Sequence, residues 1–287
     1  MYDFRNKTAI VTGASGGIGR ATAALLAARG ARVIAAARNA VELESLAEQA
    51  CARGGVVIAQ PTDVTDPQQC SALVQHAVDR FGGVDILINN AGISMRALVL
   101  DSEIAVLRRV MDVNFWGTVN CTRAALPLLL ASSYGVLVGI SSVAGFHGLP
   151  ARSGYSASKF AMHGFLESIR IEHLNDRLHV LLVAPGFTRS SIRRHALTAD
   201  GLEQAETPRD EARLMSAERV AAHILSAIYW KKRNRIISFE AQLVALMQRI
   251  LPHWVDRAIY NSMLREPDSP LQRRSKPDRF DPVPGSH

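Results

Sequence analysis

Short apolar runs alternate with longer amphipathic stretches along most of this chain. The runs are apolar throughout and show no period of two, which is typical of strands buried on both faces of a parallel sheet. They are Lys7–Thr12, Ala31–Ala37, Val56–Gln60, Val84–Asn89, Gly135–Ser141, Leu178–Ala184 and, last, Arg235–Ser238. Their alternation with helical stretches predicts an α/β fold, a doubly wound parallel sheet of the Rossmann-like kind.

The stretches between these runs have the length and the stop signals of helices. Gly30 follows the first stretch and Gly54-Gly55 the second, where glycine commonly ends a helix. Pro127 predicts a break in the stretch from Asp101 to Ala131, which we expect to carry one or two helices. The expected helices are Arg20–Arg29, Val41–Arg53, Pro67–Phe81, Asp101–Ala131, Tyr155–Asn175 and Ala217–Trp230.

The pattern divides the chain into three segments. We expect residues 1–240 to form a single α/β domain, residues 241–265 an amphipathic helical extension, and residues 266–287 a disordered tail rich in proline and charge. In the extension, apolar residues recur at helical spacing, and the basic stretch Lys231–Arg235 precedes it. Such a segment could touch a membrane surface, cap a pocket or form a subunit interface.

Composition narrows the functional class. No run approaches the roughly 18 apolar residues that would cross a bilayer, and the first residues lack the regions of a signal peptide. The three cysteines are scattered, which argues for a reducing, cytoplasmic setting and against a zinc site. Of the net charge of +7, +5 lies between Lys231 and His287, where eleven basic residues face six acidic ones. We see no nucleic-acid-binding module in this distribution.

A glycine-rich turn follows the first predicted strand. Residues 12–19 read TGASGGIG and lead straight into the first helix, so the turn can hold a pyrophosphate at the helix amino terminus. We therefore expect a nucleotide site there, against the alternative of a purely structural turn. The candidate residues are Gly13, Ser15, Gly17, Ile18 and Gly19.

Two charged residues suggest which nucleotide binds. Arg38 ends the second strand, where an acidic residue would bind ribose hydroxyls, and an arginine can pair with a 2′-phosphate. This favours NADP(H). The alternative is that Arg38 is exposed to solvent after the strand and does not contact a cofactor. Asp63, after the third strand, can accept a hydrogen bond from adenine, or it can form an Asx turn or start the helix that follows.

Tyr155 and Lys159 are four positions apart in the predicted helix, so their side chains share one face. A nearby ammonium lowers the pKa of a phenol, and such a tyrosine can exchange a proton with a substrate oxygen. We expect this pair to carry the chemistry. Taken alone, a surface tyrosine and lysine would give the same pattern.

Together these motifs resemble the short-chain dehydrogenase/reductase family. The resemblance spans about residues 5–240 and rests on TGASGGIG, Asp63-Val64, Asn89-Asn90-Ala91-Gly92, Asn114, Ser142, Tyr155, Lys159 and Pro185-Gly186, in that order. It implies one dinucleotide-binding catalytic domain, a nicotinamide cofactor, and a homodimer or homotetramer. It also implies that Tyr155 is the acid or base and that Lys159 holds the nicotinamide ribose.

The resemblance implies roles for other residues. Ser142, or its neighbour Ser141, would donate a hydrogen bond to the substrate oxygen; the spacing to Tyr155 favours Ser142. Asn114 would hold a water that relays protons to Lys159, unless it is a buried asparagine satisfied by backbone. The remaining cofactor contacts would come from Val64, Asn90, Ala91, Gly92, Pro185, Gly186 and either Thr188 or Ser190.

We therefore expect an NADP(H)-dependent oxidoreductase that interconverts an alcohol and a carbonyl, with no catalytic metal. Its small-molecule substrate would be partly apolar, because Met95, Leu149 and Pro150 are candidates for the pocket wall. His147 could touch substrate, but a surface position in its loop is the preferred interpretation. A sensor or scaffold that binds NADPH without turnover is the alternative, and the extension leaves a membrane-peripheral location open.

Overall fold

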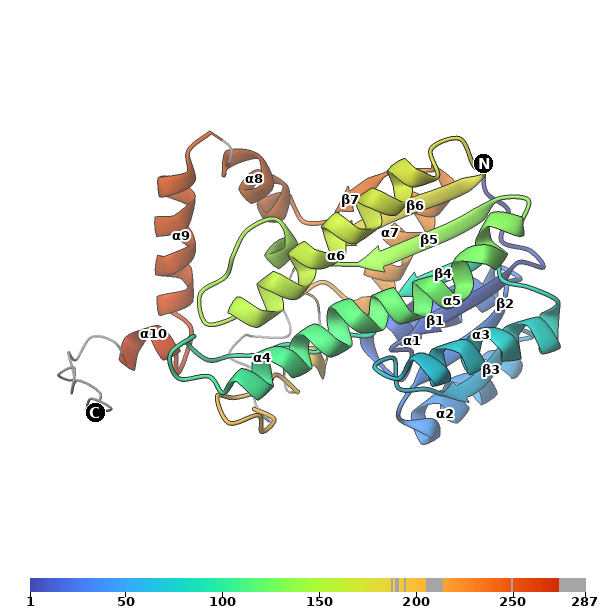
Figure 1. Cartoon of the computed structure of the whole chain (residues 1–287), viewed down its shortest axis with the longest axis horizontal. Coiled ribbons are helices and arrows are strands. Elements are labelled where there is room, and N and C mark those ends of the chain that lie inside the picture. The colour runs from blue at the N-terminus through green and yellow to red at the C-terminus, as the bar shows by residue number, and fades with distance from the viewer. Residues whose placement is uncertain (187, 189–190, 194, 205–213, 249, 274–287) are drawn as a thin grey trace, which may run out of the picture.

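Seven parallel strands form one twisted sheet in the order β3-β2-β1-β4-β5-β6-β7. The structure is a computed structural model and describes residues 1–186, 188, 191–193, 195–204, 214–248 and 250–273. The strands are β1 Thr8–Thr12, β2 Arg32–Ala37, β3 Val56–Pro61, β4 Ile86–Asn89, β5 Gly135–Ile140, β6 Leu178–Ala184 and β7 Asn234–Ile236. The doubly wound sheet predicted from the sequence is confirmed (Figure 1).

Helices cover both faces of the sheet. They are α1 Gly17–Ala28, α2 Ala40–Cys51, α3 Pro67–Phe81, α4 Ile104–Met111, α5 Gly117–Ala131, α6 Ser153–Glu172 and α7 Ala217–Tyr229. The extension adds α8 Phe239–Met247, α9 Pro252–Leu264 and α10 Pro270–Arg273. Because adjacent residues of a strand point to opposite faces, Val11 joins the core under α1, α2 and α7, and Ile10 joins the core under α3, α5 and α6.

The strand order reverses on either side of β1, which pairs with β2 on one edge and with β4 on the other. At such a switch point the loops leave in opposite directions and open a crevice at the carboxyl ends of the strands. The glycine turn after β1 and the loop after β4 both lie at this crevice. The fold therefore brings these two loops together at one crevice.

The helix around Pro127 differs from the prediction. α5 continues from Gly117 through Pro127 to Ala131 without a break. Proline in a helix interior costs about 3 kcal/mol, but Ala125 and Leu129 on either side of it are fully buried against the sheet. Tertiary packing outweighs the local preference here.

The carboxyl-terminal part also differs from its prediction. Residues 266–273, assigned to the tail, pack on the rest of the protein: Glu266 and Ser269 are buried, and so is Leu271 in α10. They are held because Glu266 pairs with Arg96 and Arg152 of the α/β domain. The remainder of the predicted tail, residues 274–287, lies outside the described residues.

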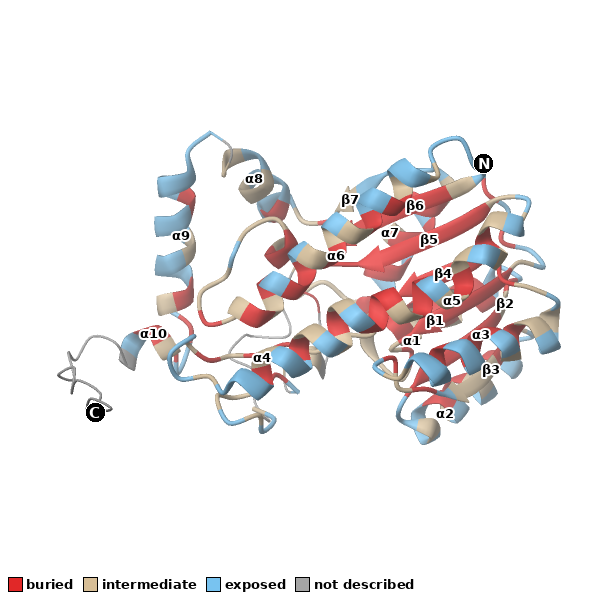
Figure 2. Ribbon diagram, in the orientation of Figure 1, coloured by how far each residue is buried: buried red, intermediate tan, exposed pale blue. Residues whose placement is uncertain are grey.

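The basic stretch Lys231–Arg235 is only partly beside the extension. The Nζ of Lys231 lies 4.0 Å from the ring centre of Tyr134, and the ring of His179 donates to the carbonyl of Lys232, which places these two lysines near the amino ends of β5 and β6. Arg235 belongs to β7, pairs with Val183 near the carboxyl end of β6, and is followed closely by α8. Figure 2 shows α8 and α9 with long exposed faces at that other end.

Within the part of the chain that the structure describes, no helix is both long enough and apolar enough to cross a bilayer.

Candidate active site

A cavity of about 500 Å³ opens at the carboxyl ends of the strands. Sixteen of the eighteen predicted site residues line it, and the exceptions, Gly19 and Asn114, lie directly behind its wall. The residues come from the glycine turn and from the loops after β2, β3, β4, β5 and β6, together with the first turns of α6. Positions more than 170 residues apart in sequence therefore meet in one cleft.

The glycine turn is closely packed against the loop after β4. Gly13 has φ +64°, and a Cβ there would lie 2.8 Å from the Cα of Ala91. A Cβ at Gly19 would overlap the carbonyl oxygen of Gly13 and the side chain of Asn90. Only glycine at these two positions lets the first turn of α1 approach the strand ends.

The turn also fits a bound phosphate. α1 begins at Gly17, and no side chain among the described residues caps its amino terminus. The first N–H groups of the helix therefore point into the cleft without a side-chain partner, beside the positive end of the helix dipole. This is the donor set that a pyrophosphate needs.

Two polar side chains hold the turn in place. Asn90 donates through Nδ2 to the carbonyls of Thr12, at 2.9 Å, and Gly13, at 3.1 Å. The Oγ1 of Thr12 in turn accepts from the backbone N–H groups of Asn90 and Ala91, each at 3.0 Å. Asn90 thus acts through its side chain as well as through its backbone. Thr12 was not singled out from the sequence, although it opens the TGASGGIG motif.

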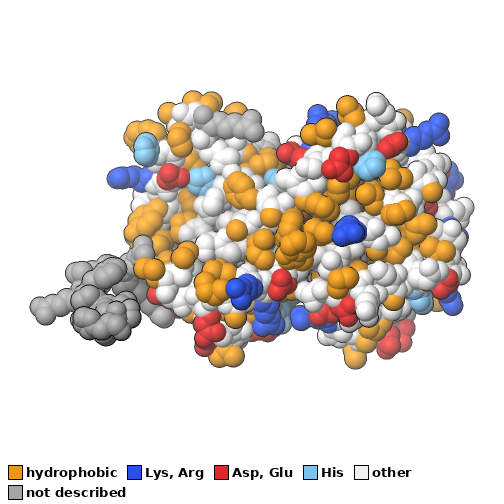
Figure 3. Space-filling view, in the orientation of Figure 1, with side chains coloured by type: hydrophobic (Ala, Val, Ile, Leu, Met, Phe, Trp, Pro, Cys, Tyr) orange, Lys and Arg blue, Asp and Glu red, His pale blue; other side chains and the backbone are white. Residues whose placement is uncertain are grey.

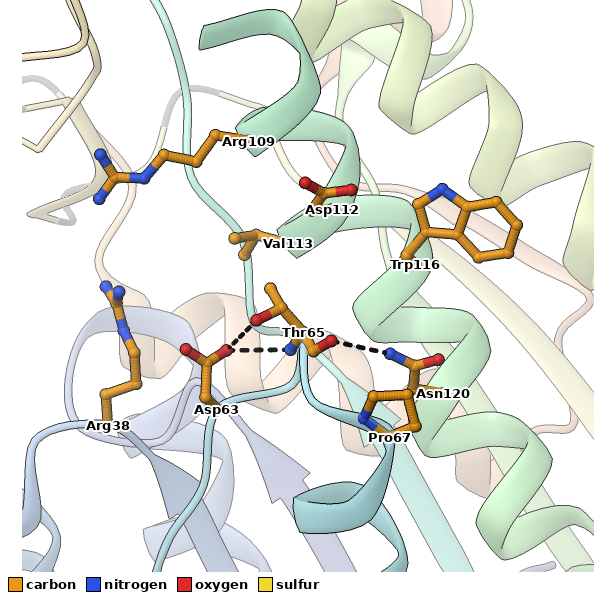
Figure 4. A pocket seen from close by; sticks show the side chains of 9 residues that line it. All are labelled: Arg38, Asp63, Thr65, Pro67, Arg109, Asp112, Val113, Trp116 and Asn120. Carbon is orange, nitrogen blue, oxygen red and sulfur yellow. Dashed lines mark hydrogen bonds between the residues drawn. The ribbon is translucent and has the colours of Figure 1, made fainter. Parts of the chain in front are cut away.

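A second cavity of about 550 Å³ adjoins the first at the end of β2 (Figure 4). Arg38 and Arg109 enter it from opposite walls. The Oδ1 of Asp63 accepts from the backbone N–H of Thr65, at 2.9 Å, and from its hydroxyl, at 2.8 Å. This is the Asx-type turn considered from the sequence. Figure 4 shows the other carboxylate oxygen of Asp63 turned toward Arg38, so the side chain still presents an acceptor to the cavity.

Lys159 is buried at the base of the cleft. Its side chain is 3% exposed, and its Nζ donates to the carbonyl of Ile140 at 2.9 Å. Nζ lies 5.8 Å from the centre of the Tyr155 ring. Burial lowers the pKa of Lys159 to about 8, because the charged ammonium is poorly solvated there.

The pKa of Tyr155 differs in direction from the prediction. Burial raises it above its ordinary value, and the hydroxyl of Ser142 and the charge of Arg152 offset only part of that rise. Lys159 does not reverse the effect: its ammonium is directed at Ile140, and its own charge is destabilised by burial. In the free protein Tyr155 therefore holds its proton at neutral pH.

The two serines before Tyr155 have different surroundings. Ser141 is buried, and its Oγ lies 2.6 Å from Nε2 of His163. Burial lowers the pKa of His163 to about 4, so this ring is neutral near pH 7. Ser142 lines the cleft and interacts with the phenol of Tyr155, while its Oγ accepts from the backbone N–H of Ala144 at 3.2 Å. The geometry favours Ser142 over Ser141 as the group that reaches a substrate.

Asn114 lies in a π-helical turn, Asp112–Trp116, that joins α4 to α5. Its side chain is fully buried and pairs with Ile93 through two hydrogen bonds, at 2.8 and 3.0 Å, and with the hydroxyl of Ser158 at 2.9 Å. These bonds match the alternative of a buried asparagine satisfied chiefly by backbone. They fix the loop after β4, because two of them join Asn114 to the backbone of Ile93. The packing is close here: a Cβ at Gly92 would lie 3.1 Å from the Oδ1 of Asn114 and 3.5 Å from the Nζ of Lys159.

The corner after β6 completes the cleft. Pro185, Gly186 and Thr188 line it, and the hydroxyl of Thr188 donates to the carbonyl of Gly186 at 3.0 Å. Ser190, the alternative to Thr188, lies outside the described residues.

The substrate end of the cleft is walled by apolar side chains. Ile93, Leu149, Ile192 and Leu197 line it, whereas Met95 is fully buried behind them. His147 is not a free surface residue. Its Nδ1 lies 2.9 Å from the side-chain oxygen of Gln248, and its Nε2 lies 3.3 Å from Asp256. The extension thus holds the loop that carries Leu149.

Sequence comparison agrees with this geometry. Residues 7–200 match the family described as short chain dehydrogenase. A bovine protein, dehydrogenase/reductase SDR family member 7B, is 36% identical over 253 residues, which are 86% of this chain and 78% of the relative. The chain belongs to the short-chain dehydrogenase/reductase family. It is therefore an oxidoreductase of the class that acts on CH–OH and C=O groups.

A second relative and two solved structures are also similar to this chain. The putative oxidoreductase SadH of Mycobacterium tuberculosis is 36% identical over 259 residues, 88% of this chain and 93% of its own. A crystal structure of a family member from Burkholderia phymatum in complex with NAD superposes with a TM-score of 0.79 at 25% identity, and covers 87% of this chain and 95% of that one. An alcohol dehydrogenase from the archaeon Thermococcus sibiricus, complexed with 5-hydroxy-NADP, has a TM-score of 0.71 at 22% identity, with coverage of 80% and 94%, and shares the fold.

Several residues of this family member's cleft were not identified from its sequence. Arg109 could not be identified because the sequence does not show which face of its helix packs near Arg38. Arg152 could have been considered from the sequence, since it lies only three positions before Tyr155. Among the described residues, no group of three or more histidine, cysteine and acidic side chains could hold a metal ion.

Proposed function

We propose that this protein is an NADP(H)-dependent oxidoreductase that interconverts a ketone or aldehyde and the corresponding alcohol. The observation that supports this most is the meeting of Ser142, Tyr155 and Lys159 in the cleft whose other end is the glycine turn. A phosphate-binding turn and a proton donor at the two ends of one cavity match the needs of nicotinamide chemistry.

A bound nicotinamide would supply the hydride in reduction and accept it in oxidation. Ser142 would donate a hydrogen bond to the substrate oxygen and hold it beside Tyr155. Tyr155 would give its phenolic proton to that oxygen as the carbonyl carbon is reduced, and would take the proton back in the reverse direction. Its raised pKa keeps the proton available at neutral pH, which suits the reductive direction.

Lys159 would hold the nicotinamide ribose hydroxyls. Its Nζ donates one hydrogen bond to Ile140 and can form further ones, because an ammonium has three donors. Binding of hydroxyl acceptors would restore part of the solvation that burial removes, and would favour the charged form. The charged ammonium would then stabilise the phenolate of Tyr155 when its proton has been transferred.

We assign the cofactor as NADP(H) because of the charge at the end of β2. Arg38 lines both cavities, and Arg109 enters the same space from α4. Two guanidiniums favour a 2′-phosphate over a free ribose hydroxyl. The rival assignment is NAD, which is bound in the related structure from Burkholderia phymatum.

Arg38→Asp should shift the cofactor preference toward NADH. Losing a charge-assisted pair with the 2′-phosphate and adding a carboxylate should change the ratio of the NADPH and NADH dissociation constants by about 10- to 100-fold. Fluorescence titration with each reduced cofactor measures the ratio, and Arg29→Asp, on the exposed end of α1, is the matched control. An unchanged ratio in Arg38→Asp would remove the role assigned to Arg38.

Turnover separates an enzyme from the alternative, a protein that binds NADPH as a sensor or scaffold. We suggest a panel of ketones and aldehydes with increasing apolar size, followed by loss of NADPH absorbance. The apolar wall formed by Ile93, Leu149 and Leu197 leads us to expect the faster members to carry an apolar group beside the carbonyl. Tight NADPH binding without turnover of any panel member would favour the sensor.

The protein also has surfaces suited to assembly. Trp116 and Phe160, on the segments around α5 and α6, are about half exposed, and Figure 3 shows apolar side chains gathered over these helices. We propose a homodimer or homotetramer built on this face. A cytoplasmic location remains part of the proposal, on the cysteine pattern alone.

Contact of the extension with a membrane surface is a second proposal. Phe239, Leu246, Ile250 and Trp254 are each more than half exposed on α8 and α9 or between them. Lys231 and Lys232 lie at the other end of the sheet, so apolar contact would have to supply most of the affinity. We expect sedimentation with phosphatidylcholine vesicles that falls severalfold in Leu246→Glu/Trp254→Glu and is unchanged in Leu174→Glu, an exposed leucine beyond α6. Equal sedimentation of all three proteins, or of none, would contradict membrane contact.

A further inference from the structure

A carboxylate from the extension is buried between two arginines of the α/β domain. The Oε2 of Glu266 lies 3.2 Å from an Nη2 of Arg152 and 3.7 Å from an Nη2 of Arg96. The three side chains are 5, 12 and 9% exposed. Arg96 also donates to the carbonyl of Pro267, and Arg152 contacts the sulfur of Met263. We call these three charged residues the Glu266 cluster.

Arg152 connects this cluster to the reacting end of the cleft. It immediately precedes α6, and Tyr155 follows three positions later, in the first turn of that helix. Both side chains line the same cavity. Glu266 therefore lies one side chain away from Tyr155, although 111 residues separate the two in sequence.

The charged and titratable groups that face Tyr155 can be named. Arg152 lies immediately before its helix and Lys159 lies on that helix. Ser142 comes from the loop after β5, and His163 is neutral behind Ser141. Lys159 has a pKa of about 8 and loses its charge in mildly alkaline solution. A guanidinium stays protonated throughout this range. Arg152 is thus a permanent positive charge beside the phenol. The net electrostatic effect on the phenol depends on how closely the negative charge of Glu266 compensates this positive charge.

We propose that the extension completes the wall of the active site through the Glu266 cluster, and that Arg152 is the positioning residue by which Glu266 tunes the proton affinity of Tyr155. The catalytic meaning of this coupling rests on the proposed function, but the electrostatic coupling does not. An extension that served only to bind membrane or a second subunit would have no need of a buried carboxylate between two guanidiniums at the cleft.

If the two residues are coupled in this way, neutralising Glu266 and neutralising Arg152 should shift the ionisation of Tyr155 in opposite directions. Glu266→Gln removes the compensating charge, so Tyr155 should ionise at lower pH; Arg152→Gln removes the positive charge, so Tyr155 should ionise at higher pH. Each shift should be on the order of one pH unit, from the interaction of unit charges near a protein surface. Arg152→Lys, which keeps the charge, should titrate closer to wild type than Arg152→Gln does.

The readout is the ultraviolet difference absorbance of the phenolate after a rapid pH jump, with each variant referenced to the same variant carrying Tyr155→Phe. This measurement needs neither cofactor nor substrate. Glu240→Gln, which removes an exposed carboxylate from α8, is the matched control and should titrate like wild type. The thermal midpoint of each protein shows whether it is folded. The double variant Glu266→Gln/Arg152→Gln should titrate between the two single variants, because it removes two charges of opposite sign together.

Shifts in the same direction, or none in folded Glu266→Gln and Arg152→Gln, would overturn the proposal and leave the cluster as a structural tie. A second arm follows the pH dependence of alcohol oxidation with the fastest member of the substrate panel in its alcohol form. In that assay, the pH at which kcat/KM rises should be lower in Glu266→Gln and higher in Arg152→Gln than in wild type. If the titrations shift as expected but no panel member turns over, the proposed function fails and the coupling stands.

Discussion

Tyr155→Phe should lower turnover of every carbonyl substrate by at least about a thousandfold, within the range expected for the loss of a general acid. The variant removes one oxygen and leaves the ring in place, so the walls of the cleft and the glycine turn should be unchanged. NADPH affinity should therefore stay within about threefold of wild type, since the phenol supplies a proton in the transition state and little ground-state binding. Initial rates and fluorescence titration of NADPH measure the two quantities.

Tyr260→Phe provides the control for this prediction. Tyr260 lies on α9 and is 45% exposed, so removal of its hydroxyl should change neither quantity. A Tyr155→Phe protein that keeps most of its activity would show that the proton comes from another group. A variant that loses NADPH binding to the same extent as turnover would show that Tyr155 is needed for binding and would leave its chemical role without support.

Gly19→Ala should abolish cofactor binding at concentrations where wild type is saturated. The added Cβ would overlap the carbonyl oxygen of Gly13 and the Nδ2 of Asn90, and both are held by the hydrogen bonds around Thr12. The first turn of α1 must then move away from the phosphate position. A displacement of this kind should weaken NADPH binding by about a hundredfold or more, as for misplaced catalytic groups.

The rise in thermal midpoint on addition of NADPH reports this loss directly. Gly83→Ala is the matched control, because a Cβ at Gly83 meets nothing within 4 Å and its φ is not positive. We expect a normal NADPH-dependent rise in Gly83→Ala and none in Gly19→Ala. An equal rise in the two proteins would mean that the glycine turn is not the phosphate site.

Much of the fold could be predicted because the local patterns and the tertiary structure agree. Five of the seven apolar runs became strands buried on both faces, whereas the edge strands β3 and β7 are partly exposed. The TGASGGIG turn follows β1 at the reversal of strand order. Pro127 shows the opposite case. The sequence reports its local cost, but the burial of Ala125 and Leu129 that outweighs this cost depends on how α5 packs on the sheet.

The candidate site was likewise predictable where it depends on local sequence patterns and not where it depends on tertiary packing. Most residues in the family motifs line one cleft, so their spacing was sufficient to predict that they would lie together. The direction of the Tyr155 pKa was not predictable, because it depends on burial and on the direction in which the Lys159 ammonium points. The pairing of Glu266 with Arg96 and Arg152 was not predictable either, since it joins segments at least 114 residues apart that no local pattern connects.

The central claim is that hydride passes between NADPH and a carbonyl carbon beside Tyr155. The most direct test is to incubate the protein with the ketone panel and NADPH deuterated at the transferable position, and to locate the label by NMR and mass spectrometry. We predict that deuterium appears at the carbinol carbon of the product, on a single stereochemical face, and that Tyr155→Phe gives none above background. Product alcohol without deuterium at that carbon, or equal labelling by Tyr155→Phe, would contradict the account.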